Sequence, residues 1–189
     1  SGVQIRSNSA AGYQDGRVHG YQVEIDPSPR AFTAGVYDES RRGWLADLKD
    51  NSAAQQAFRQ GEWNRVRVEA RGSSLKTWLN GVAAASIDDE LTRRGFIGLQ
   101  VHNTAEKEPL EVRWRNIRIR DFGDPWQTPM ATATVLVGAT DDTREWQHPG
   151  KGGAPIRWKW TDGVLEVEPG SGNIATTKSF GDCRLHVEF

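Results

Sequence analysis

Short runs of alternating polar and apolar residues constrain the fold of this chain more than any other feature of its sequence. Successive side chains of a β-strand point to opposite faces, so each run predicts a strand with one apolar and one polar face. Four such runs stand out, at residues 3–6, 21–26, 99–102 and 183–189. If these strands share a sheet, their polar faces form one groove.

The polar side chains of these runs are acids, amides, histidines and arginines. They are Gln4, Arg6, Gln22, Glu24, Asp26, Gln100, His102, Arg184, His186 and Glu188. A groove lined by such groups suits the binding or cleavage of sugars better than it suits other ligands. We therefore expect a carbohydrate as the partner of this groove.

The rest of the chain predicts many further strands and almost no helix. Strand-like runs recur at the spacing of an all-β sandwich, and the hairpin signals Asn80-Gly81 and Asp162-Gly163 separate pairs of such runs. One helix candidate spans residues 53–60, with the preceding Asn or Ser as its cap. The prediction is an all-β fold, a two-sheet jelly-roll sandwich with at most one short helix.

The length, charge and cysteine count of the chain argue against several classes of function. The 189 residues suffice for one domain with a full core. A formal charge of -1 gives no electrostatic argument for binding nucleic acid or an acidic membrane. One cysteine excludes an internal disulfide and a cysteine-based zinc site. No apolar run reaches the roughly 18 residues of a membrane span.

The first residues, Ser1-Gly2-Val3, are no signal peptide and lack Met, so we expect a chain that has been processed or cut. We expect a periplasmic or secreted bacterial protein. The cysteine count is compatible with export, because many exported bacterial proteins lack disulfides.

Several strings of residues resemble the 3-keto-disaccharide hydrolase domain family. They lie at 20–26 (GYQVEID), 42–45 (RGWL), 61–64 (GEWN), 79–81 (LNG), 95–102 (GFIGLQVH) and 115–117 (RNI). The strings follow the family's order over about residues 1–120 and are specific when taken together. The resemblance implies a concanavalin A-like, lectin-like β-sandwich, which agrees with the fold that the alternation predicts.

Residues 131–189 resemble the beginning of the same domain, so the order of the parts is rotated. The run at 176–189 normally precedes a Ser-Gly-Val-x-x-Arg pattern, which here occupies residues 1–6. The chain is then a circular permutant of one domain, or it spans the junction of two tandem domains and has a tandem or strand-exchanged neighbour. The parts add up to about one domain. We therefore predict a single β-sandwich domain over 1–189, with 121–130 as a linker or crossover.

The resemblance implies activity on glycosides already oxidised at carbon 3 of one sugar. A ketone at carbon 3 acidifies the proton on carbon 2, and the glycosidic oxygen on carbon 1 is then a β leaving group. A general base removes the proton, a cationic group or a metal stabilises the enolate, and an acid protonates the leaving oxygen. Addition of water at carbon 1 completes a hydrolysis, whereas stopping earlier makes a lyase.

We assign candidate roles in this reaction to the polar residues of the predicted groove. Glu24 and Asp26 are the candidate bases, and His102 is the candidate second acid–base group or metal ligand. Like-charge repulsion predicts a raised pKa for one of the two carboxylates if both lie in the groove. A divalent metal would suit the acids and the histidine, although no tight ligand spacing is present. The candidate substrate-binding residues are Gln4, Arg6, Gln22, Gln100, His186 and Glu188.

Other interpretations stay open. The acids and Arg6 are also compatible with a solvated or ion-paired strand exterior, and His19 and His148 lie in predicted loops, where we expect solvent exposure. A non-catalytic carbohydrate-binding module would need stacking aromatics but no carboxyl group with a raised pKa. A family-16-type retaining glucanase would need a third carboxylate where this chain has Pro27-Ser28-Pro29. An adhesion or laminin-type domain predicts no activity on any sugar.

Overall fold

The computed structural model describes residues 1–102, 111–123, 133–149 and 154–189. Its elements are β1 (Gly2–Asn8), the 3-10 turn η1 (Gln14–Gly16), β2 (His19–Glu24), β3 (Val36–Glu39), β4 (Gly43–Ala46), α1 (Ser52–Gln56), β5 (Arg65–Arg71), β6 (Ser74–Leu79), β7 (Val82–Asp88), β8 (Gly95–Gln100), β9 (Arg113–Asp121), β10 (Thr134–Val137), the 3-10 turn η2 (Thr143–Glu145), β11 (Trp146–Gln147), β12 (Lys159–Thr161), β13 (Val164–Glu166), β14 (Ile174–Phe180) and β15 (Cys183–Glu188).

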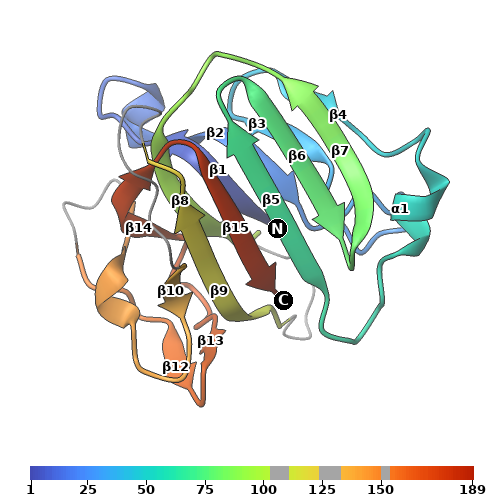
Figure 1. Cartoon of the computed structure of the whole chain (residues 1–189). Coiled ribbons are helices and arrows are strands. Elements are labelled where there is room, and N and C mark those ends of the chain that lie inside the picture. The colour runs from blue at the N-terminus through green and yellow to red at the C-terminus, as the bar shows by residue number, and fades with distance from the viewer. Residues whose placement is uncertain (103–110, 124–132, 150–153) are drawn as a thin grey trace.

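The strands form two antiparallel sheets that pack face to face (Figure 1). Sheet A has the order β11-β14-β8-β1-β2-β3-β4, and sheet B has the order β12-β13-β9-β15-β5-β6-β7, with β10 paired to β9. The apolar halves of the alternating runs form the core between the sheets: Val3, Val23 and Leu99 of sheet A and Leu185 of sheet B are each 0% exposed. The predicted all-β, two-sheet sandwich with one short helix is confirmed.

Both predicted hairpin turns form. The backbone φ is 50° and 92° at Asn80-Gly81, and 49° and 80° at Asp162-Gly163. Positive φ at both central residues is the geometry of a type I′ turn, which matches the twist of the strands it joins. These turns set the register of β6 with β7 and of β12 with β13.

The predicted helix is shorter than expected. The Asn51 side chain accepts a hydrogen bond from the Ala54 N–H and so caps α1. The helix ends at Gln56, four residues before the predicted end at residue 60. Among the described residues, no helix has the length and apolar character needed to cross a membrane.

Strands from the end of the chain lie inside both sheets. β15 pairs with β5 on one side and with β9 on the other, and β14 lies between β8 and β11. Figure 1 shows β15 between the earlier strands β5 and β9. Residues 1–123 and 133–189 therefore contribute to the same two sheets.

A β-bulge interrupts β1 after Ile5, where the pairing with both neighbouring strands shifts by one residue. Arg6 takes a left-handed backbone conformation with φ 47°. Glycines on both neighbouring strands make room for the bulge: a Cβ at Gly20 would lie 2.7 Å from the Ser7 Cα, and a Cβ at Gly95 would overlap the Ser7 carbonyl oxygen. The bulge inserts one residue, so the alternation of faces in β1 is broken beyond this point.

Candidate functional site

The outward face of sheet A carries Gln4, Gln22, Gln100 and Glu24, which together we call the amide face. Gln4 pairs with Gln22 across β1 and β2, and Gly2 lies in register between Glu24 and Gln100. The three glutamines are buried although they point away from the core, with 2%, 1% and 8% exposure for Gln4, Gln22 and Gln100. Three of the four alternating runs therefore contribute to one face.

Hydrogen bonds connect three of these side chains in a row. Gln22 Nε2 donates to Glu24 Oε2 at 2.8 Å, and Gln4 Nε2 donates to Gln22 Oε1 at 3.1 Å. Because an ionised carboxylate only accepts, Glu24 fixes the orientation of both amides. Gln4 Oε1 and Gln100 Oε1 are buried and have no hydrogen-bond partner among the described residues. Buried acceptors of this kind require a donor, and the hydroxyl groups of a sugar are suitable donors.

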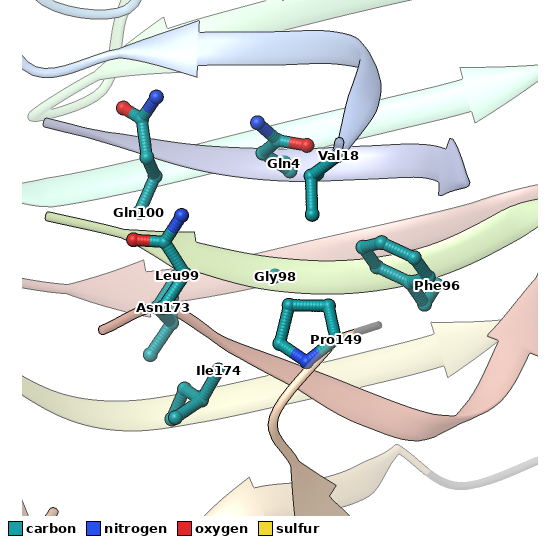
Figure 2. A pocket seen from close by; sticks show the side chains of 9 residues that line it. All are labelled: Gln4, Val18, Phe96, Gly98, Leu99, Gln100, Pro149, Asn173 and Ile174. Carbon is teal, nitrogen blue, oxygen red and sulfur yellow. The ribbon is translucent and has the colours of Figure 1, made fainter. Parts of the chain in front are cut away.

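A small open depression lies beside these amides (Figure 2). Phe96, Gly98 and Pro149 line it together with Gln4 and Gln100. In Figure 2 the side chains of Gln4 and Gln100 rise from the neighbouring strands β1 and β8, and the Pro149 ring lies on the other side of β8. The depression thus combines amide groups with apolar rings.

Aromatic side chains extend the amide face toward the edge of sheet A. Gln22 pairs in register with Tyr37, and Tyr37 pairs with Trp44. The Tyr37 and Trp44 rings meet edge to face with their centres 5.3 Å apart, and the Arg30 guanidinium lies 5.3 Å from the Trp44 ring centre. Such rings present apolar surface beside polar tips. The sequence alone did not place Tyr37 on this face; its register with Gln22 does.

Asp26 lies just past the end of β2, and its carboxylate is engaged by the loop that follows. Its Oδ1 accepts from the Ser28 N–H at 3.2 Å, and its Oδ2 accepts from Arg30 Nε at 2.7 Å. Burial acts to raise the pKa of Asp26, but hydrogen bonds from Ser28 and Arg30 outweigh it and lower this pKa. The like-charge repulsion expected between the two acids therefore does not decide the pKa of Asp26. This carboxylate organises the connection between β2 and β3.

His102 follows the end of β8 by two residues and is exposed. It lies beyond Gln100, at the same end of sheet A as Glu24, because Gln100 and Glu24 both pair with Gly2. The Cα atoms of Gln100 and Glu24 are two strand spacings apart, roughly 10 Å. His102 and Glu24 therefore lie at the same end of sheet A, His102 just after β8 and Glu24 at the end of β2, with β1 between these two strands.

The structure corrects the prediction that Arg6 lies on the face of Gln4. The bulge turns the Arg6 side chain toward the turns of sheet B, and its guanidinium donates to Gly181 O at 3.2 Å, Gly72 O at 2.8 Å and Asp182 Oδ1 at 2.8 Å. Arg6 is 2% exposed. It connects the two sheets and does not line the amide face.

The fourth alternating run lies in the other sheet, so the prediction that His186 and Glu188 share the groove is wrong. Both residues point outward from β15 of sheet B, on the opposite side of the sandwich. Glu188 Oε2 accepts from Arg115 Nε and from Asn116 Nδ2, each at 2.8 Å. Burial is the main cause of a lowered pKa at His186, whose Nε2 lies 3.4 Å from Glu188 Oε1. Alternation shows which side chains share a face of a strand, but it does not assign the strand to a sheet.

His148 is buried, with 7% exposure, although its loop position predicted contact with solvent. Its Nδ1 lies 3.1 Å from the Asn173 carbonyl oxygen, and the next residue, Pro149, lines the depression. No local pattern in the sequence indicates this burial, because it depends on packing against the start of β14. His19 is half-buried, and its ring lies 4.0 Å from that of Tyr13.

In the part of the chain that the structure describes, no three His, Cys, Asp or Glu side chains gather closely enough to hold a metal ion. The divalent metal that the sequence allowed therefore has no set of ligands within those residues.

Comparison with known proteins identifies the family. No curated protein matches the chain. A family model described as the 3-keto-alpha-glucoside-1,2-lyase-like domain matches residues 1–120, which hold strands β1 to β8 and the whole amide face. The chain therefore belongs to this family, the 3-keto-disaccharide hydrolase family that its sequence strings resemble.

Proposed function

We propose that this protein cleaves glycosides that carry a ketone at carbon 3 of one sugar, and that the amide face is its active site. The family description, which names a 1,2-lyase of 3-keto-alpha-glucosides, supports the substrate class. The observation that carries the proposal is the hydrogen-bonded row of Gln4, Gln22 and Glu24, in which the Glu24 carboxylate accepts from Gln22 and the Gln22 amide accepts from Gln4.

Glu24 is the proposed general base. Its side chain is 12% exposed, Gln22 holds its Oε2, and its Oε1 lies 3.5 Å from the Ser1 nitrogen. A positioned carboxylate can abstract a proton that a neighbouring ketone acidifies. Asp26 is the weaker base of the two acids, since its pKa is lowered.

The opposite side of the site lies on β8. Gln100 supplies amide N–H donors for the enolate oxygen that forms at carbon 3, and His102 donates the proton that the leaving oxygen needs. Gly2 lies in register between Gln100 and Glu24, and the Gln22 side chain covers it, because a Cβ at Gly2 would come within 2.6 Å of Gln22 side-chain atoms.

The proposed reaction removes the carbon-2 proton to Glu24. The electron pair of that bond forms a carbon 1–carbon 2 double bond conjugated with the ketone, and the carbon 1–oxygen bond breaks. The departing oxygen takes a proton and leaves as the free alcohol. Water that adds at carbon 1 of the enone product gives net hydrolysis.

The test is the Glu24→Gln variant, assayed on an aryl 3-keto-glucoside and on the same glucoside without the ketone. We expect wild-type turnover of the oxidised substrate alone and a loss of at least about a hundredfold in the variant. Exchange of the carbon-2 proton with D₂O should stop in the same variant. Asp26→Asn is the matched control and should retain turnover. Near-wild-type rates for Glu24→Gln would exclude Glu24 as the base.

A non-catalytic carbohydrate-binding role is the second candidate. The Tyr37 and Trp44 rings beside the amides favour it, because sugars stack on aromatic faces. It predicts that wild-type protein binds glycosides with and without the ketone and turns over neither.

A further inference from the structure

Four adjacent strands of sheet B, which are β9, β15, β5 and β6, carry many more positive than negative charges on their outward face. Its carboxylates on β5, β6, β9 and β15 are Glu69 and Glu188. Its cations on the same strands are Arg65, Arg67, Arg71, Lys76, Arg113, Arg115, Arg118, Arg120 and Arg184. We call this surface the arginine face.

The two carboxylates are already engaged by neighbouring arginines. Glu69 lies 3.1 Å from Arg71 and 2.8 Å from Arg184. Glu188 lies 2.8 Å from Arg115. No carboxylate of the described residues lies within 4.0 Å of Arg65, Arg67 or Arg118, so positive charge in the middle of the face has no partner there.

A hollow of about 200 Å³ lies among these unpaired cations. Arg65, Arg67, Trp78 and His186 line it. The Arg67 guanidinium stacks on the Trp78 ring at 3.6 Å, which holds its plane while leaving its N–H edge free to donate. The face therefore contains a concave, oriented group of donors as well as net charge.

The donors continue in a line across the sheet. In register, Trp78 of β6 pairs with Arg67 of β5, Arg67 with His186 of β15, and His186 with Arg118 of β9. Neighbouring strands are about 4.8 Å apart, a step close to the length of one sugar residue in a chain. A polysaccharide with a carboxylate on successive sugars could meet Arg67 on β5, His186 on β15 and Arg118 on β9.

We propose that the arginine face is a second, non-catalytic site that binds an acidic polysaccharide of uronic-acid type. Guanidinium groups bind carboxylates through paired hydrogen bonds. Nucleic acid fits less well, because the Arg67 guanidinium covers the Trp78 ring on which a base would stack. The site lies on the opposite side of the sandwich from the amide face, so it does not depend on the proposed catalysis.

The experiment measures binding of polygalacturonate by titration calorimetry at low salt. Wild-type protein should bind, and added salt should weaken the binding. The variant Arg65→Glu/Arg118→Glu changes two exposed side chains of the arginine face and should weaken binding about tenfold or more. The control Lys49→Glu/Lys178→Glu makes the same charge change at side chains that are 68% and 67% exposed and lie outside this face. It should bind like wild type.

Several results would overturn the proposal. They are absence of wild-type binding, equal weakening in both double variants, and displacement of polygalacturonate by single-stranded DNA that binds more tightly. Thermal unfolding of both double variants checks that they are folded. Glu24→Gln should bind polygalacturonate like wild type, so a failure of the catalytic proposal and a failure of this one are distinguishable.

Discussion

At the scale of single residues, the acids Glu24 and Asp26 show how the surroundings of a side chain determine its role. Glu24 is the last residue of β2 and belongs to the hydrogen-bonded amide row, whereas Asp26 accepts from Ser28 and Arg30 in the following loop. Their spacing predicts a shared face. The strand ends between the two acids. Glu24 is therefore a candidate base, whereas Asp26 stabilises the loop.

Asp26 should make stability depend on pH. Its pKa is lowered in the folded protein, so its contribution is present above the pKa of an unfolded Asp, about 4, and is lost as the pH falls through the folded value. Asp26→Asn should lower the free energy of unfolding by about 2 kcal/mol at pH 7 and by less at pH 3. Urea unfolding at both pH values measures this. An equal loss at the two values would contradict the assignment.

Gly2→Ala tests the hydrogen-bonded row of Gln4, Gln22 and Glu24 without replacing any of these three residues. The new Cβ would lie 2.6 Å from Gln22 side-chain atoms, so Gln22 must move and Glu24 loses its donor. We expect turnover of a 3-keto-glucoside to fall about tenfold or more, because one charge-assisted hydrogen bond is lost. Gly12→Ala is the control, since nothing lies within 4 Å of a Cβ added there. Unchanged kinetics in Gly2→Ala would show that the row does not position the base.

At the scale of elements, the bulge in β1 is what removes Arg6 from the amide face and gives it a structural role. Asp182 accepts from the Arg6 guanidinium and from the Gly72 N–H, so one carboxylate connects β1 to the turns before β15 and β6. The sequence around Arg6 continues the alternation and gives no local sign of the bulge. The glycines that accommodate the bulge, Gly20 and Gly95, stand on neighbouring strands that are distant in the chain.

Arg6→Ala should lower the free energy of unfolding by about 3 kcal/mol, because it leaves a partly buried Asp182 without its ion-pair partner. Arg6→Lys should restore little, since one ammonium cannot reach three acceptors in the directions that a guanidinium does. Arg93→Ala, which breaks an exposed pair with Glu90, should cost less than about 1 kcal/mol. Chemical unfolding ranks the three variants. A similar loss for Arg6→Ala and Arg93→Ala would argue against the cross-sheet role.

At the scale of the whole molecule, both sheets require strands from both parts of the chain. β15 occupies the middle of sheet B, and its residues Cys183, Leu185 and Val187 are buried in the core. Removing it would expose β5 and β9 as unpaired edges. The region matched by the family model is therefore incomplete as a folding unit in this structure.

A fragment of residues 1–123 should fail to unfold cooperatively, because sheet B would be split where β15 lies. A peptide of residues 133–189 mixed with it should restore a cooperative transition. Circular dichroism during thermal unfolding measures both results. A cooperative transition for 1–123 alone would show that β15 is dispensable for folding.

The sequence by itself determined the features that depend on neighbours in the chain. Alternation identified the strands and the buried side of each, and Asn80-Gly81 and Asp162-Gly163 identified two hairpins, since the conformation of a turn follows from its own residues. The edge strand β4 and the two-residue β11 were not predicted.

Only the tertiary structure decided which polar faces meet. It joined Gln4, Gln22, Glu24 and Gln100, and it placed His186 and Glu188 among arginines on the opposite side, a local charge that the near-neutral total hides. The physical reason is that strand alternation has the same period in either sheet. Assignment of a strand to a sheet depends on long-range pairing and on how the whole apolar surface is buried, and neither is encoded in any one segment.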